Sequence, residues 1–226
     1  MCASDLLAVL ETDGLGRIIA LSLSVSLSAT ALATLFGTSL GAVLAIYPVP
    51  GRRVLVLIIN ALLGLPPVVV GLALYLLLSR SGPLGLLALL FTPGAMVIAQ
   101  ALLALPIVAA LVYDATAASW MEYGAALQVD GATRMQSIPH LLAITRDRLV
   151  TAILAGFGRT ISEVGAILIV GGNIADYTRT MTTAIVLETS MGDLSLALGL
   201  GFVLIGISIA VSTTIFTLGI KGGRWW

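Results

Sequence analysis

Five long apolar runs divide this chain of 226 residues, and they restrict its fold more than any other feature. A helix needs about 20 mostly apolar residues to cross the hydrocarbon core of a bilayer, and only helices or closed barrels satisfy their backbone groups there. The charged fraction of 10% is far below that of an ordinary soluble domain, about 25%. We therefore predict five helical spans, near residues 18–47, 54–78, 93–113, 149–170 and 194–220.

The expected fold class is all-α: a polytopic membrane helix bundle of about five transmembrane helices in a single domain, residues 1–226. No long polar block or low-complexity tract interrupts the chain. Pro66 and Pro67 lie inside the second run and lack the backbone N–H that a helix needs, so they predict a kink there.

The basic residues predict the orientation of this bundle. Arginine and lysine collect on the cytosolic side of membrane proteins, and an odd number of spans puts the two termini on opposite sides. The N-terminus is expected outside and the C-terminus in the cytosol, because seven of the eleven basic residues then lie inside. This orientation makes residues 114–148, the longest polar stretch, cytosolic.

Charge and residue content exclude several classes of function. Eleven basic residues balance eleven acidic ones, so the chain has no excess positive charge to neutralise nucleic-acid phosphates. His140 is the only histidine and Cys2 the only cysteine, and neither stands in a metal-binding or nucleophile motif. We expect no catalytic residue, no metal site and no cofactor on this chain, and no nucleic-acid partner.

The stretch 114–148 is too apolar for a free linker. Trp120, Tyr123 or Gly124, and Leu127 recur at spacings of three and four and predict one apolar stripe on a short helix. Asp130 and Gly131 form a turn dipeptide, so we expect a helix, a turn and a second helix parallel to the membrane. Two interpretations stay open: an amphipathic segment that packs under the bundle, or a coupling element that a cytosolic protein binds.

A missing motif favours the coupling element. The chain has no G-x-x-x-x-G-K-[ST] phosphate loop and its only lysine is Lys221, so if ATP drives transport here, another polypeptide binds the nucleotide. The segment EYGAALQVDGATRMQSIP, residues 122–139, resembles the cytosolic coupling motif of ABC-importer permeases, although the motif's glutamate is absent from its usual position. The resemblance implies contact with the ATPase for Glu122, Gly124, Ala125, Ala126, Asp130 and Gly131.

A second resemblance covers residues 156–201. Arg159 and Glu163 begin an R-x-x-x-E-x-G-A pattern, and G-N-I and T-x-T patterns follow it. This stretch is similar to the permeases for oxyanions such as molybdate, sulfate and tungstate, and most similar to the tungstate type. The chain is then expected to be type I ABC importer permease-like, multi-pass in a prokaryotic cell inner membrane, and to import tungstate, with molybdate or sulfate as alternative cargo.

The same resemblance implies partners in the lipid bilayer and on both of its sides. A second copy of the chain would complete a homodimer, with the transport path between the copies. A cytosolic ABC ATPase dimer would bind ATP-Mg, and an extracytoplasmic oxyanion-binding protein would deliver the anion.

Arg159 and Glu163 stand out because they place two charges inside an apolar run. An ionised group near the bilayer centre is costly and usually faces protein or a water-filled path. The two residues are four apart, so we expect them to share a helix face and to form an ion pair. The pair either fixes helix packing or dimer register, or it marks one of two gate states and lets Arg159 meet the passing anion.

Residues 171–185 offer hydroxyl and amide donors that suit an oxyanion, with a helix N-terminus near Thr180. The candidates for the oxyanion path are Asn173, Thr178, Arg179, Thr180, Thr182 and Thr183. In an alternative interpretation the threonines cap a short re-entrant helix, and both interpretations can hold at once.

Two rival functions also stay open. A stand-alone secondary transporter or channel would use Arg159 and Glu163 as a proton or ion relay. A scaffold that transports nothing would only recruit a cytosolic protein to residues 114–148. We prefer the importer, because the expected topology, the cytosolic stretch and the missing phosphate loop agree with the two resemblances.

Overall fold

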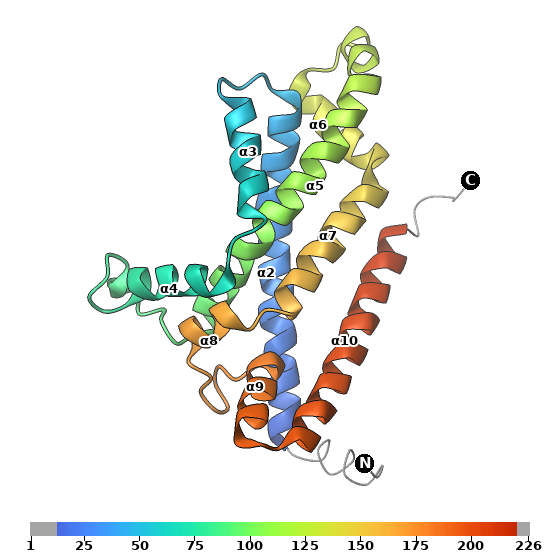
Figure 1. The fold of residues 1–226 in the computed structure, drawn as a ribbon. Helices are drawn as coiled ribbons and strands as arrows, with labels where there is room; N and C mark the ends of the chain where they lie inside the picture. Colours follow the sequence, from blue (N-terminus) through green and yellow to red (C-terminus); the bar gives the residue numbers. More distant parts are fainter. Residues whose placement is uncertain (1–12, 221–226) are drawn as a thin grey trace. The chain divides into compact units, whose positions relative to one another are not determined.

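The computed structural model describes residues 13–220, and this part of the chain is helical without any strand (Figure 1). In chain order the elements are α2 (Asp13–Ile46), α3 (Arg52–Leu62), α4 (Pro67–Leu78), the short 3-10 helix η1 (Gly85–Leu87), α5 (Pro93–Val129), α6 (Arg134–Ile144), α7 (Arg146–Ile161), α8 (Gly165–Gly171), α9 (Met181–Met191) and α10 (Leu194–Ile220). The predicted all-α class is confirmed. Lys221 lies outside the described residues.

Up to five stretches of the described chain can cross a membrane. α2, α5 and α10 are each long and apolar enough to span it as single helices. The pairs α3–α4 and α7–α8 qualify when each pair counts as one bent span. About five spans were expected, and two of them are broken. The side of the membrane on which each terminus lies stays a prediction.

The second span is broken rather than kinked. α3 ends at Leu62 and α4 begins at Pro67, while Pro66 between them has an extended backbone with a ψ of 123°. Two consecutive prolines remove two amide donors, and each disfavours helical geometry in the residue before it. Pro67 suits the first position of a new helix, because its N–H would have no partner there in any case.

α5 continues well beyond the expected end of the third span at Tyr113 and reaches Val129. The apolar stripe that contains Trp120 is therefore part of this helix, and the prediction of a separate short helix is wrong. Residues 114–119 include no glycine or proline, so nothing in them ends the helix. The predicted turn is present, since Gly131 has a φ of 83°, and α6 follows it.

The described residues fall into two compact units, each built from three stretches of chain. The first unit takes the residues up to Ala29, Pro66–Ala101 and Gly158–Val211, and the second takes Thr30–Leu65, Leu102–Phe157 and the residues from Ser212 on. That the whole chain forms one domain stays a prediction.

The second unit fixes α6 to the C-terminal end of α2. Leu141 of α6 is fully buried in a cluster with Ile46, and Arg134 Nη1 donates to the Ile46 carbonyl at 3.3 Å. A cation at the last carbonyls of a helix is favourable, because the helix dipole is negative there. Arg52 adds a second link, with its guanidinium 5.4 Å from the centre of the Tyr113 ring and 3.1 Å from the Tyr113 hydroxyl.

The first unit packs its helices through small side chains. α2, α9 and α10 meet at the buried residues Leu15, Ala184 and Leu200. α4 lies against α8 (Figure 1), and a Cβ added to Gly71 of α4 would lie 2.8 Å from the Ala166 Cα of α8. Small residues at a helix contact allow the backbones of membrane helices to approach closely.

Candidate functional site

Residues 162–164 of the first unit separate α7 from α8 and so break the predicted fourth span. The carbonyl of Thr160, in the last turn of α7, accepts from the Glu163 N–H at 3.2 Å and from Gln100 Nε2 of α5 at 2.8 Å. The Thr160 hydroxyl donates to the Ser26 carbonyl of α2 at 3.3 Å. These residues are all buried, so a side chain of a neighbouring helix bonds the Thr160 carbonyl that the end of α7 leaves without its usual helical partner.

Glu163 lies in this break with 3% of its side chain exposed, and both carboxylate oxygens have partners. Oε2 is 3.5 Å from Arg159 Nη2, so the expected ion pair is present, while Oε1 accepts from the Ala166 N–H at 3.0 Å. The expected shared helix face is wrong, because α7 ends at Ile161 and Glu163 comes after it. The carboxylate instead caps the first turn of α8, where a negative charge is favourable.

The start of α9 is capped by its threonines. Thr180 is the N-cap residue: its hydroxyl accepts from the Thr183 N–H, and the Thr183 hydroxyl accepts from the Thr180 N–H at 3.0 Å. The Met181 N–H donates to the Ser22 hydroxyl of α2 at 2.8 Å. The capping interpretation therefore describes this helix end, and three of its backbone amides are bonded within the protein.

Thr182 connects α9 to the break. Its hydroxyl donates to the Glu163 carbonyl at 3.0 Å and lies 3.1 Å from the Thr180 hydroxyl. The backbone of Glu163 thus contacts α9, while its side chain contacts both Arg159 and α8. The ion pair, the break and the start of α9 form one hydrogen-bonded network.

The loop between α8 and α9 carries the remaining candidates for the oxyanion path. Thr178 is fully buried, and its hydroxyl donates to the Gly171 carbonyl at 2.6 Å and accepts from the Ile174 N–H at 2.9 Å. Asn173 Oδ1 and Arg179 Nε are buried atoms to which residues 13–220 offer no hydrogen-bond partner. Such atoms are rare in folded proteins, and an oxyanion can accept only from the donor of the two, Arg179 Nε.

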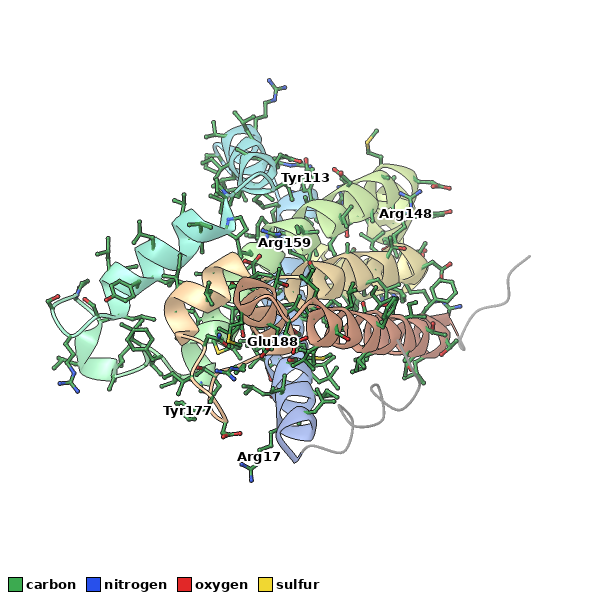
Figure 2. The ribbon with its side chains drawn as sticks, turned by 60° about the horizontal axis from the view of Figure 1, so that its bottom comes forward. Arg17, Tyr113, Arg148, Arg159, Tyr177 and Glu188 are labelled. Carbon is green, nitrogen blue, oxygen red and sulfur yellow. The ribbon has the colours of Figure 1, made fainter. Side chains whose placement is uncertain are left out.

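Arg17 reaches the same loop from α2. Its Nη1 is 3.9 Å from Asp176 Oδ1, and both side chains are largely exposed. Figure 2 shows Arg17 at the edge of the ribbon and Arg159 among the helices. An exposed pair at this distance contributes little to stability, so we assign it no part in holding the break.

The predicted coupling residues lie in the second unit, in the last turns of α5 and in the turn after it. Gly124 is buried against the Trp120 ring, since a Cβ there would lie 2.8 Å from a ring carbon. The exposed members are Glu122, Ala125, Ala126, Asp130 and Gly131. A hollow of about 260 Å³ lies beside them and is lined in part by Glu122, Ile144 and Arg148. These residues are thus at the surface of their unit, except for Gly124.

Sequence reasoning missed the polar residues that hold the break from α2 and α5. Ser22 and Ser26 lie four apart in an apolar run, and Gln100 is the only polar side chain in residues 93–112. Polar residues inside a span usually face the interior of the bundle, so these positions did carry a signal. Their spacing alone did not show which backbone groups they bind.

These features define a class of protein. Long apolar helices, two bent apolar helix pairs and an ion pair with a buried carboxylate in one of them belong to a polytopic membrane protein with a polar interior.

Comparison with known proteins then identifies the family, although no family model matches the chain. The tungstate uptake system permease protein TupB of Peptoclostridium acidaminophilum is 40% identical over 201 residues, which cover 89% of this chain and 88% of that protein. A probable anion ABC transporter permease protein of Haloferax volcanii is 39% identical over 200 residues, 86% of each chain. TupB of Campylobacter jejuni is 37% identical over 161 residues, 71% of this chain and 67% of that protein.

The chain therefore belongs to the family of ABC transporter permeases that includes the tungstate uptake permeases, as its sequence predicted. Sulfate and molybdenum transport system permeases are more distant: examples from Salmonella typhimurium and Bacillus subtilis are 29% and 30% identical. A permease with several spans is a multi-pass protein of the cell membrane, so the expected location is confirmed.

Proposed function

We propose that the chain is the membrane-spanning subunit of an ATP-driven importer of tungstate. The observation that carries this proposal is the 40% identity to a tungstate uptake permease over 89% of the chain, against 29% and 30% for the sulfate and molybdenum permeases. Molybdate or sulfate as cargo is the second candidate, because those permeases are relatives as well.

The ATPase is a separate polypeptide in this proposal and holds ATP-Mg. The absence of a phosphate loop from the sequence supports this, as do the exposed residues from Glu122 to Gly131. Arg134 and Leu141 connect α6 to the C-terminal end of α2. A protein that binds next to α6 can therefore transmit a movement to α2. This chain then needs no cofactor and catalyses no reaction itself.

A second copy of the chain and an extracytoplasmic oxyanion-binding protein complete the transporter. α10 supports the homodimer, because Leu198, Phe202, Ile205 and Ile209 are exposed and lie on one stripe of the helix. Such a stripe needs lipid or another apolar helix against it.

The network around Glu163 gives the transporter a gate in this proposal. The break brings a buried carboxylate, a partly exposed guanidinium and the start of α9 together: the carboxylate pairs with Arg159, and the Glu163 carbonyl accepts from Thr182 of α9. Packed interfaces of this kind have discrete arrangements rather than a continuous range. Arg159 and Arg179 supply the positive charge that a dianion on the path would meet.

Elemental analysis of cells with and without the gene tests the function. Cells are grown in limiting tungstate, molybdate and sulfate, and tungsten, molybdenum and sulfur are measured. Loss of tungsten alone, restored by the wild-type gene, is the expected result. Loss of molybdenum or sulfur alone would instead assign that cargo, and unchanged levels of all three would contradict the proposal.

Proteoliposomes separate the importer from the stand-alone carrier. Uptake of tungstate by vesicles that contain only this chain, without an ATPase, would show a secondary transporter or channel. Uptake that requires a co-purified ATPase and ATP is the result that the proposal expects.

A further inference from the structure

Arg80 is the only charged residue between Arg53 and Asp114, and it lies two residues after the end of the apolar helix α4 in the first unit. Its side chain is exposed, and within residues 13–220 it has no hydrogen-bond or ion-pair partner. An unpaired guanidinium at the end of an apolar helix of a membrane protein is well placed to meet an anionic group from outside the chain.

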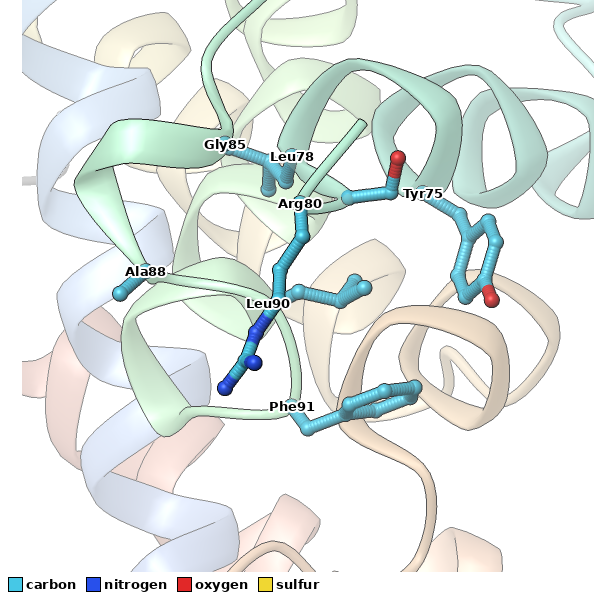
Figure 3. A pocket seen from close by; sticks show the side chains of 8 residues that line it. Tyr75, Leu78, Arg80, Gly85, Ala88, Leu90 and Phe91 are labelled. Carbon is cyan, nitrogen blue, oxygen red and sulfur yellow. The ribbon is translucent and has the colours of Figure 1, made fainter. Parts of the chain in front are cut away.

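A pocket of about 380 Å³ surrounds this side chain (Figure 3). It is lined by Tyr75, Leu78, Ser79, Arg80, Gly85, Ala88, Leu90 and Phe91. In Figure 3 the Arg80 side chain extends along the pocket toward Phe91. The centres of the Phe91 and Tyr75 rings lie 6.1 Å apart, in an edge-on arrangement. No acidic residue lines the pocket, so its charge is positive. We call it the Arg80 pocket.

The loop that forms the Arg80 pocket has a fixed shape. The Leu84 N–H donates to the Leu77 carbonyl at 2.9 Å, and the Phe91 N–H donates to the Val170 carbonyl at 2.8 Å. Gly82 is packed so closely on the last turn of α4 that an added Cβ would meet backbone oxygen atoms. The pocket is therefore built by backbone contacts and does not depend on a flexible loop closing around a ligand.

Apolar side chains stand next to this positive pocket. Leu86 is fully exposed, and Leu84 and Leu87 keep 44% and 57% of their surface exposed. Exposed leucines on a loop that follows a membrane helix are suited to contact acyl chains. The loop thus offers a cation and an apolar surface side by side.

We propose that the Arg80 pocket binds an anionic phospholipid, with the lipid phosphate on the guanidinium and the acyl chains along Leu84, Leu86 and Leu87. The planar guanidinium matches phosphate with paired N–H donors, and a net negative lipid gains more from an unpaired cation than a zwitterionic one does. This inference goes beyond the proposed transport function and does not depend on the cargo.

Native mass spectrometry of the full-length chain in detergent micelles tests the proposal. The probes are phosphatidylglycerol and phosphatidylcholine with identical acyl chains. An arginine near a charged lipid surface changes affinity about fivefold, so we expect wild type to prefer phosphatidylglycerol by about that factor. Arg80→Gln should abolish the preference, whereas Arg17→Gln, which changes another exposed arginine of the same unit, should retain it.

Two further measurements separate the possible sources of the signal. Leu86→Gln changes a side chain with no packing contacts, and it should weaken the binding of both lipids without changing their ratio. Inorganic phosphate should not displace the lipid, since it lacks acyl chains. Displacement by inorganic phosphate, or an unchanged lipid preference in Arg80→Gln, would overturn the proposal. Arg80→Gln that keeps the lipid preference but loses a bound soluble protein would likewise overturn it and show a protein interface.

Discussion

Replacing Glu163 by glutamine tests the network at the α7–α8 break. Glutamine is nearly the same size and keeps an oxygen that can accept from the Ala166 N–H, but it removes the negative charge that faces Arg159. If the ion pair stabilises one gate state, Glu163→Gln leaves the chain folded in the membrane. It then allows the ATPase to turn over without tungstate uptake.

The magnitude follows from the burial of the pair. Removing one partner of a fully buried ion pair costs about 3–5 kcal/mol, because the other charge is left uncompensated. Arg159 keeps 30% of its side chain exposed, and the N–O distance of 3.5 Å is longer than in a strong charge-assisted bond. We therefore expect a loss of about 2 kcal/mol, which lowers the Tm of a chain of this size by about 4–8 °C. Glu163→Ala should lose about 1 kcal/mol more, because it also removes the cap of α8.

The assay uses the purified transporter complex in proteoliposomes. ATP hydrolysis and tungstate uptake are measured on the same vesicles, and thermal unfolding is measured on the same preparation. Glu188→Gln is the control, because Glu188 is a half-buried acid of the same unit with no ion pair among the described residues. Glu163→Gln with wild-type uptake for each ATP hydrolysed would refute the gate, and an unchanged Tm would refute the estimate of the energy.

Two further substitutions test the packing around the break. Thr182→Val keeps the side-chain volume but leaves the Glu163 carbonyl without its hydroxyl donor, so we expect a loss of about 1–2 kcal/mol in thermal unfolding. The Thr189 hydroxyl donates only within α9, to the Ile185 carbonyl, so Thr189→Val should be close to wild type. Equal losses of stability in Thr182→Val and Thr189→Val would contradict the role of Thr182. Gly71→Ala places a methyl group 2.8 Å from the α8 backbone and should cost about 1–3 kcal/mol. A Cβ added to Gly201 has nothing within 4 Å, so Gly201→Ala should not destabilise the chain. Equal melting temperatures of Gly71→Ala and Gly201→Ala would count against the close contact between α4 and α8.

The spans were predictable because length and hydropathy are properties of a local stretch of sequence. The run at 194–220 has the bounds of α10, and the run at 18–47 ends within one residue of α2, which begins five residues earlier, at Asp13. The end of α5 was not predictable in the same way, since residues 114–119 combine three alanines, which favour a helix, with Asp114, Thr116 and Ser119, which are polar enough for a loop. Hydropathy shows where lipid contact ends, and a helix does not have to end there.

The candidate site was predictable only in part, for a related reason. The Arg159–Glu163 pair and the cap at Thr180 depend on residues three or four apart, so the sequence contains them. The bonds from Gln100 to Thr160 and from Thr160 to Ser26 join residues 60 and 134 positions apart. No local pattern encodes such partners, because they depend on how the helices pack.

The break at residues 162–164 shows how far this dependence on packing goes. The segment has no proline, and its local sequence allows the helix to continue to Val170. The broken form is stabilised because the carbonyls of Thr160 and Glu163 accept bonds from α5 and α9, and because the Glu163 carboxylate caps α8. Any movement of α9 that removes the Thr182 bond therefore weakens the break and its ion pair together. An anion on the path can drive such a movement only if it binds one of the two arrangements more tightly than the other.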